Sequence, residues 1–95
     1  MLNRGQKIVR KHTENKALIL ETIRAYGTLG ARGGATTLNV MYEAYLPYNQ
    51  ARRYLMELLQ GRMIEHNVGT KKYMITEKGI KYLTAYYDLD NIVNN

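Results

Sequence analysis

The chain has 95 residues and a formal net charge of +6, because 14 Lys and Arg outnumber 8 Asp and Glu. This length supports one small hydrophobic core, since short chains bury a smaller fraction of their surface than long ones. The sequence contains no Cys and no Ser, which excludes disulfides, thiolate zinc sites and the common nucleophile triads. Its two His residues, His12 and His66, lie far apart in the sequence, so we expect no metal site, no cofactor and no enzymatic activity.

The N-terminal segment, residues 1–12, is basic and polar. It carries Arg4, Lys7, Arg10 and Lys11 without any acid, and it lacks the apolar stretch of a signal peptide. No run in the sequence reaches the roughly 18 apolar residues of a membrane span. We therefore expect a basic N-terminal arm on a cytoplasmic protein that has no membrane partner.

The first predicted helix covers about residues 13–26. Ile19, Ile23 and Tyr26 share one face at the spacing i, i+4, i+7, which is the period of an amphipathic helix. Four glycines within residues 27–34 end this helix and predict a flexible connector. The connector lacks the Lys-Ser/Thr ending of a phosphate-binding loop, so we expect no nucleotide site there.

A second, short helix is predicted to follow a threonine cap at position 36 or 37 and to stop before Pro47. Its apolar face is predicted to consist of Leu38, Met41 and Tyr45.

Pro47 suits the first turn of the third predicted helix, because proline lacks the N–H group that would be unpaired there. This helix runs to about Gln60, and Gly61 is predicted to end it as the left-handed residue beyond the cap. Its predicted buried face consists of Ala51, Leu55, Leu58 and Leu59.

Residues 63–68 and 72–76 are predicted to form a β-hairpin around a turn at 69–71. The alternating positions of its first strand are Ile64, His66 and Val68. Thr76 then caps a last helix within residues 77–95. Three helices, a hairpin and a final helix describe an α+β winged helix-turn-helix fold, with its core over residues 13–76.

Several short pieces of the chain carry a family resemblance. They lie within residues 41–83 and are Met41-Tyr42, Tyr54-Leu55 with Leu58, Gly61-Arg62-Met63-Ile64, and Tyr73-Met74-Ile75-Thr76-Glu77-Lys78-Gly79. With these pieces the segment resembles the archaeal winged-helix proteins that include small, basic, dimeric DNA-binding chromatin proteins. The resemblance implies binding of double-stranded DNA, either with little sequence preference or in a regulatory role, and dimerisation through the last helix.

The exposed start of the third helix is the first candidate DNA contact. Asn and Gln side chains can read adenine, and Arg can read guanine or bind phosphate. The alternative is a solvated helix face on which Arg53 pairs with Glu57 four residues later. Tyr48 either hydrogen-bonds a phosphate or packs on the turn. The candidates are Tyr48, Asn49, Gln50, Arg52 and Arg53.

The second candidate contact is the hairpin tip, where Lys71 and Lys72 follow Gly69. Lysines at such a tip would bind the phosphate backbone without reading sequence. The alternative is an ordinary solvated turn. Arg62, just beyond the end of the third helix, either adds to this contact or only complements the negative end of the helix dipole. The basic arm either lies in a minor groove or along phosphates, or is a disordered, solubilising tail.

The last helix has more apolar surface than one small core requires. Ile80, Leu83 and Tyr87 form one stripe, which we expect to cover the chain's own domain. A second stripe is expected to meet another copy in a homodimer, and the alternative is one broad stripe that packs on the first helix. The second stripe consists of Tyr82, Tyr86, Leu89 and Val93.

These patterns favour a double-stranded DNA-binding protein that acts as a transcription regulator or as a chromatin-type architectural protein, associated with the nucleoid in the cytoplasm. Two alternatives stay open. A winged helix can also serve as a protein–protein interaction module, and exposed tyrosines can stack the bases of RNA or single-stranded DNA.

Overall fold

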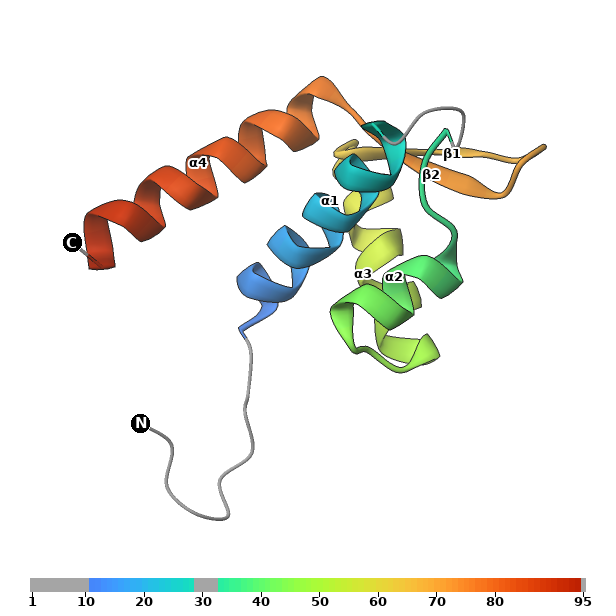
Figure 1. Ribbon diagram of the computed structural model, residues 1–95, viewed down its shortest axis with the longest axis horizontal. Coiled ribbons are helices and arrows are strands. Elements are labelled where there is room, and N and C mark those ends of the chain that lie inside the picture. Colours follow the sequence, from blue (N-terminus) through green and yellow to red (C-terminus); the bar gives the residue numbers. More distant parts are fainter. Residues whose placement is uncertain (1–10, 29–32, 95) are drawn as a thin grey trace, which may run out of the picture.

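The computed structural model describes residues 11–28 and 33–94, apart from the side chains of Asp90, Val93 and Asn94. The basic arm thus lies almost wholly outside the described residues. The elements follow the predicted order and form an α+β winged helix-turn-helix: α1 (His12–Thr28), α2 (Thr37–Ala44), α3 (Tyr48–Gln60), β1 (Ile64–Asn67), β2 (Lys72–Ile75) and α4 (Glu77–Asn94). The hairpin and the end of α4 project from opposite sides of the three-helix body (Figure 1).

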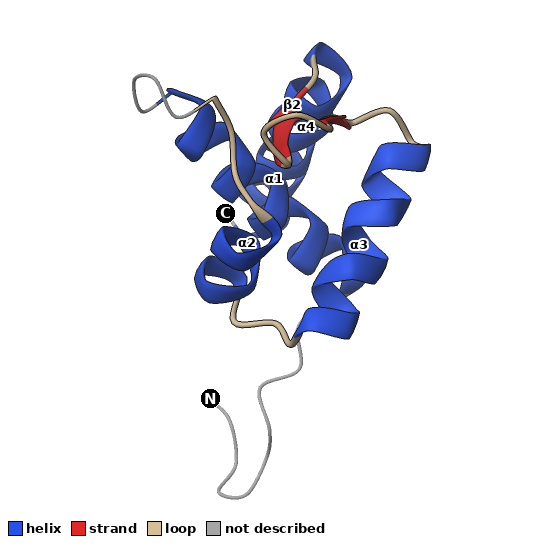
Figure 2. Cartoon of the chain, turned by 90° about the vertical axis from the view of Figure 1, so that its right-hand side faces the viewer, coloured by secondary structure: helices blue, strands red, loops and turns tan. Residues whose placement is uncertain are grey.

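One hydrophobic core joins all four helices and the hairpin. Viewed from the hairpin side, α3 runs along one side of the domain and α2 lies across from it (Figure 2). Burial of these aliphatic side chains supplies the main driving force for folding. The largest fully buried side chains are Ile19, Leu20, Ile23, Val40, Leu55, Leu58, Ile64 and Leu83.

The buried face of α2 differs from the predicted one. Val40 and Ala44 are buried, whereas Leu38 is 57% and Tyr45 is 85% exposed. Of the three predicted positions, Met41 alone packs against the core. The small Val and Ala side chains let this eight-residue helix approach its neighbours closely, and that contact decides which side faces inward.

The caps of α2 and α4 are as predicted. The Thr36 hydroxyl accepts a hydrogen bond from the Asn39 backbone N–H at 3.1 Å, and the Asn39 side chain accepts from the Thr36 N–H at 2.9 Å. This reciprocal pair is a capping box. At the start of α4, the Thr76 hydroxyl accepts from the Gly79 N–H at 3.1 Å and donates to the Arg62 carbonyl at 2.7 Å.

Both predicted ends of α3 are shifted by one residue. Pro47 is the N-cap, with an extended backbone, and therefore precedes the first turn. At the other end, Gly61 keeps a right-handed conformation and Arg62 takes the left-handed one at φ 60°. Arg62 N–H donates to the Leu59 carbonyl and Met63 N–H to the Leu58 carbonyl, which is the hydrogen-bond pattern of a Schellman motif with Arg62 at C′.

The hairpin is shorter than predicted, because each strand has four residues and the turn spans 68–71. Val68 lies in this turn and is exposed, so it does not continue the strand. Cross-strand pairing places His66 opposite Tyr73, with ring centroids 4.5 Å apart. His66 therefore packs on the wing, as expected.

The described end of the glycine-rich link is fixed to the wing and is not a free connector. Ala35 exchanges two backbone hydrogen bonds with Tyr73, at 3.0 and 2.7 Å. The preceding Gly34 is buried at φ 126°, and a Cβ atom there would clash with the Tyr73 carbonyl oxygen. Only glycine allows this close approach between link and strand. Residues 29–32 lie outside the described part.

A polar network that the sequence did not reveal joins α1 to α3. Tyr54, which the predicted buried face did not include, is 5% exposed. Its hydroxyl lies 2.6 Å from His12 Nδ1 and accepts a hydrogen bond from Asn15 Nδ2 at 3.0 Å. His12 was predicted to belong to the arm, but it is the first residue of α1. The Oδ1 atom of the buried Asn15 has no hydrogen-bond partner among the described residues.

Another tyrosine joins α4 to α1. The Tyr87 hydroxyl donates to Glu21 Oε2 at 2.8 Å. Partial burial, together with this hydrogen bond and the nearby Glu21 charge, raises the pKa of Tyr87 to about 12. Because the pKa is raised above its ordinary value of 10.0, the folded state favours the protonated hydroxyl, and the associated stabilisation is lost as pH rises above 10.

Replacing Tyr54 with Phe tests the network between α1 and α3. Removal of the hydroxyl leaves the buried Asn15 amide without its partner, so we expect the free energy of unfolding to fall by about 1–3 kcal/mol. Urea denaturation followed by circular dichroism measures the change. Tyr42→Phe is the matched control, because Tyr42 is exposed, and it should stay within about 0.5 kcal/mol of wild type. Equal stability of the Tyr54→Phe variant and wild type would show that the network contributes nothing.

Replacing Lys71 with Gly tests backbone strain in the hairpin turn. Lys71 has φ 58°, a conformation that costs a non-glycine residue about 1 kcal/mol or more. We expect Lys71→Gly to raise the free energy of unfolding, although by less than the full strain energy, because glycine also adds freedom to the unfolded chain. Thr70→Gly is the control: Thr70 has no positive φ, so glycine there only adds freedom to the unfolded chain and should destabilise. A loss of stability in Lys71→Gly would contradict the assignment of strain.

Candidate nucleic-acid interface

The outer face of α3 is set by the side that it buries. Ala51, Tyr54, Leu55 and Leu58 face the core, and their spacing leaves the opposite side of the helix in solvent. The predicted contact residues Tyr48, Asn49, Gln50, Arg52 and Arg53 are all exposed there or at its edges. An open hollow of about 370 Å³ lies along this face, lined by Asn49, Arg52, Arg53, Met56, Glu57 and Gln60.

The arginines of this face are not neutralised by the helix itself. Glu57, the expected partner of Arg53, instead pairs with Lys16 of α1 at 3.0 Å. Among the described residues, Arg53 has no ion pair. Arg52 Nη1 donates to the Tyr48 hydroxyl at 3.2 Å, so this tyrosine orients an arginine. Both guanidinium groups are exposed to solvent and neither pairs with a carboxylate in the described part of the chain, which suits an anionic ligand.

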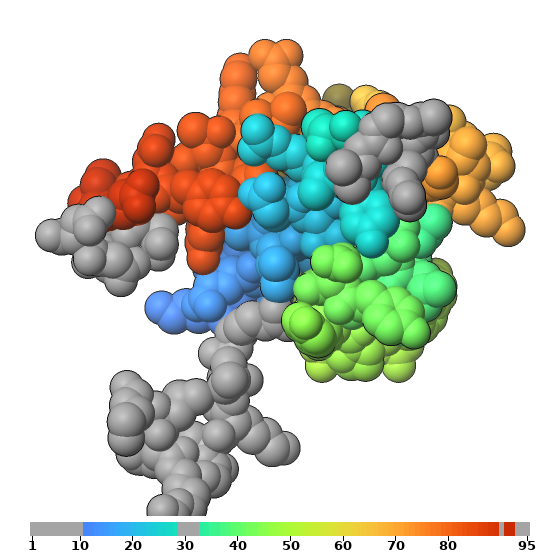
Figure 3. Space-filling view, viewed as in Figure 1, coloured from blue at the N-terminus to red at the C-terminus, as the bar shows by residue number. Residues whose placement is uncertain are grey.

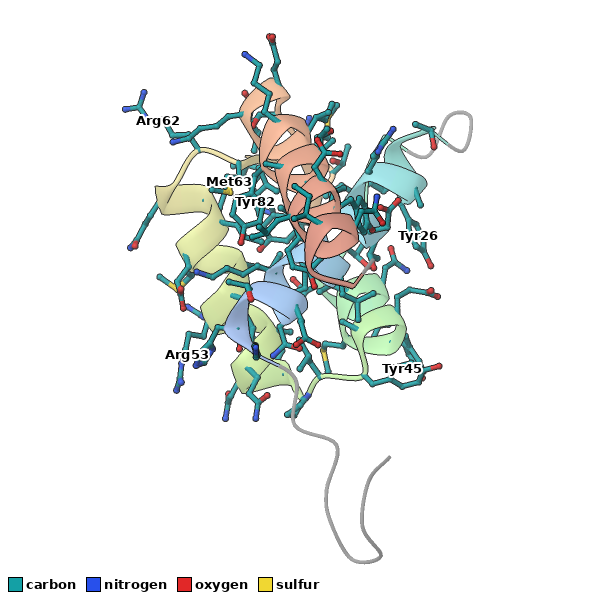
Figure 4. All side chains as sticks on the ribbon, turned by 90° about the vertical axis from the view of Figure 1, so that its left-hand side faces the viewer. Tyr26, Tyr45, Arg53, Arg62, Met63 and Tyr82 are labelled. Carbon is teal, nitrogen blue, oxygen red and sulfur yellow. The ribbon has the colours of Figure 1, made fainter. Side chains whose placement is uncertain are left out.

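Arg62 extends the basic surface beyond the end of α3. In Figure 4, Arg53 and Arg62 lie on the same side of the molecule, and Tyr45 of the α2 end lies on the other. A second open hollow, of about 500 Å³, adjoins Arg62 and is lined by Leu59, Arg62, Ile64, Glu65, His66 and Thr76. The left-handed backbone of Arg62 makes its position a strained one, and strained residues are concentrated at functional sites.

The two wing lysines differ in exposure. Lys71 is exposed in the hairpin turn, where its N–H donates to the Asn67 carbonyl at 2.7 Å. Lys72, the first residue of β2, is partly buried. Lys71 is therefore the better placed of the two for a backbone phosphate.

The predicted partner surface on α4 is divided. Tyr82 and Tyr86 are partly buried and pack against the chain's own core, whereas Leu89 is 61% exposed. The side chain of Val93 lies outside the described residues. Ile92, which the sequence analysis did not single out, is 77% exposed. Ile92 follows Leu89 by three residues, and this spacing predicts that the two side chains are neighbours on the helix surface. The C-terminal half of α4 projects from the molecular body (Figure 3).

Met56 is a further site residue that sequence reasoning missed. It is 48% exposed in the hollow along α3. The spacing i, i+4, i+7, i+11 from Asn49 could have found it, because Asn49, Arg53, Met56 and Gln60 share the side opposite the buried stripe.

The described residues contain neither a metal-binding cluster nor a membrane-spanning helix. Across 11–28 and 33–94, no group of three or more His, Asp and Glu side chains is arranged to hold a metal ion. No helix in this part of the chain combines the length and apolarity needed to cross a membrane.

Comparison with known proteins agrees with this geometry. A family model described as winged helix-turn-helix matches residues 10–94, which is most of the chain. No curated protein matches. The winged helix-turn-helix is a typical non-enzymatic DNA-binding fold, so the match suggests that the domain binds DNA. The chain therefore belongs to the winged helix-turn-helix family.

Proposed function

We propose that the protein binds double-stranded DNA with α3 in the major groove and the wing on the phosphate backbone. The observation that carries this proposal is the unneutralised pair Arg52 and Arg53 on the outer face of α3. Asn49 and Gln50 beside them have the amide groups that read adenine. Lys71 and Lys72 in the wing supply charge for phosphates.

The N-terminal arm fits the same proposal through its point of attachment. The contacts of His12 with Tyr54 and of Lys16 with Glu57 hold the first turns of α1 against α3. The arm therefore joins the domain beside the helix proposed to read DNA. Its four basic residues would add to the charge available for phosphates or for the minor groove.

The proposed role is that of a transcription regulator or of an archaeal chromatin-type architectural protein associated with the nucleoid. A small chain with a net charge of +6 is suited to bind DNA largely through electrostatics. The spread of affinities across duplex sequences distinguishes the two roles, because a regulator discriminates strongly among sites and an architectural protein does not.

We further propose that the protein acts as a homodimer joined through α4. Leu89 and Ile92 present apolar side chains to solvent on the projecting half of this helix, and Tyr82, Tyr86 and Val93 lie along the same element. A monomer gains nothing from such exposed apolar residues, whereas a second copy would bury them. Two joined domains would bring two α3 helices to successive half-sites.

A protein-interaction module is a second candidate, favoured by the surface of α2. Leu38, Tyr42 and Tyr45 are exposed there, and a shallow groove of about 220 Å³ is lined by Leu38, Met41, Tyr42 and Leu46. In Figure 4, Tyr45 of this surface lies on the other side of the molecule from Arg53. If it were the main functional surface, the protein would show no salt-sensitive binding to duplex DNA.

The double variant Arg52→Ala/Arg53→Ala tests the proposed DNA interface. We expect its affinity for duplex DNA to fall at least about tenfold, because each arginine contact to a base is worth about 1–3 kcal/mol. The slope of log affinity against log salt should also decrease, by about 0.9 for each lost phosphate contact. Fluorescence anisotropy across a salt series measures both quantities, with single-stranded DNA and RNA as competitors.

The matched control for this experiment is Arg24→Ala/Lys81→Ala. Arg24 in α1 and Lys81 in α4 are exposed, and replacing them removes two positive charges, as the test variant does, but from other elements. We expect this control to retain affinity within about threefold, since distant charges act only through the screened overall field. Equal weakening by both double variants would refute a specific α3 contact, and preferred binding of single strands or RNA would favour that alternative.

Replacing Leu89 with Asp tests the proposed dimer. A charge in the centre of an apolar contact is unpaired and desolvated, so we expect the dimer dissociation constant to rise at least about tenfold. Sedimentation equilibrium over a range of concentrations measures it. Thr84→Asp, an exposed position on nearly the opposite side of α4, adds the same charge and should have little effect. A wild-type protein that stays monomeric throughout would contradict the dimer.

A further inference from the structure

The centre of the α3 outer face is apolar, although everything around it is polar. Met56 lies on the same side of the helix as Asn49, Arg53 and Gln60, directly opposite the buried stripe. It is 48% exposed and contributes to the hollow that these residues line together with Arg52 and Glu57. No packing within the described core requires it, because the core residues of α3 are on the other side.

The surroundings of Met56 identify the kind of surface that would cover it. Two guanidinium groups and two carboxamides lie around the methionine, and the one carboxylate of this lining, Glu57, pairs with Lys16. The surface is therefore suited to a partner that is anionic and rich in hydrogen-bonding groups. The partner must also present a small apolar group to the centre of the helix. A duplex major groove has this combination, because phosphates border it and the base edges carry acceptors and donors. Its apolar feature is the methyl group on carbon 5 of a pyrimidine.

We propose that Met56 is a specificity residue that contacts the C5-methyl group of a pyrimidine in the major groove. This inference rests on the proposed DNA binding by α3. The methyl group belongs to thymine in ordinary DNA and to 5-methylcytosine in modified DNA, and the two methyl groups occupy equivalent positions in the groove. Met56 thereby adds a sequence-dependent contact to an interface whose lysines recognise charge alone.

The test compares duplexes that differ only in these methyl groups. Duplexes of about 30 base pairs span roughly three helical turns, enough for two half-sites. One pair is alternating A·T against the same duplex with deoxyuridine in place of thymidine. The other pair is alternating G·C with cytosine against the same duplex with 5-methylcytosine. Wild type should bind the methylated member more tightly, by about fourfold for each contacted methyl group.

Variants connect the effect to Met56. Met56→Ala should bind methylated and unmethylated duplexes equally, because the apolar contact is gone. Met56→Leu should keep the discrimination, since leucine retains apolar reach. Met74→Ala is the matched control: Met74 lies in β2 and is 45% exposed, close to the value for Met56. It should discriminate as wild type does. Circular dichroism checks that each variant is folded.

The outcomes separate this inference from the function on which it rests. Failure of wild type to bind any duplex would overturn both. Equal binding to all four duplexes would leave DNA binding intact and overturn the role of Met56, as would discrimination that persists in Met56→Ala. A Met56-dependent effect in the uridine pair assigns the contact to thymine, and one in the cytosine pair assigns it to 5-methylcytosine.

Discussion

The rotation of α3 about its own axis is the constraint on which the rest of the surface depends. Ala51, Tyr54, Leu55 and Leu58 are buried on one side, and each residue advances the helix by about 100°. A change of one position in this packing would turn Arg53 toward the core. The hydrophobic contacts alone would tolerate some rotation, but the hydrogen bonds of the Tyr54 hydroxyl to His12 and Asn15 do not, because they require defined distances and angles.

The ion pair between Lys16 and Glu57 connects α1 to α3 and also changes the charge of the outer face of α3. It draws the single acid of α3 toward α1 and away from Arg53. Because both side chains are partly exposed, such a pair adds little to stability. Its larger consequence is electrostatic, since it leaves the outer face of α3 with two arginines that no carboxylate of the described residues neutralises.

Among the described residues, three non-glycine residues in connections between elements take the left-handed conformation. They are Tyr45 between α2 and α3, Arg62 between α3 and β1, and Lys71 within the hairpin turn. Glycine would adopt these conformations at lower cost, and Gly61 is the immediate neighbour of Arg62. Two of the three residues are cations beside the proposed DNA surface. The strain at Arg62 and Lys71 is therefore consistent with a functional use of their charge.

Much of this protein follows from the sequence by itself. Helical and strand periodicity predicted the order of the elements, because burial of one side of each element is a local property of the residue pattern. The caps at Thr36 and Thr76 were equally readable, since each lies within three residues of its partner. The exposed arginines and amides at the start of α3 followed from the same periodicity.

What only the tertiary structure decided involves contacts between distant segments. The inward side of α2 was chosen by how closely Val40 and Ala44 approach neighbouring helices, and the burial of Tyr54 by two partners about 40 residues away in α1. Arg53 lacks Glu57 as an ion-pair partner because Glu57 pairs with Lys16. The position of Ala35 depends on its backbone hydrogen bonds with Tyr73. Local sequence patterns do not specify contacts between residues that are far apart in the chain. Packing and long-range hydrogen bonds therefore determine which polar and apolar groups remain on the surface.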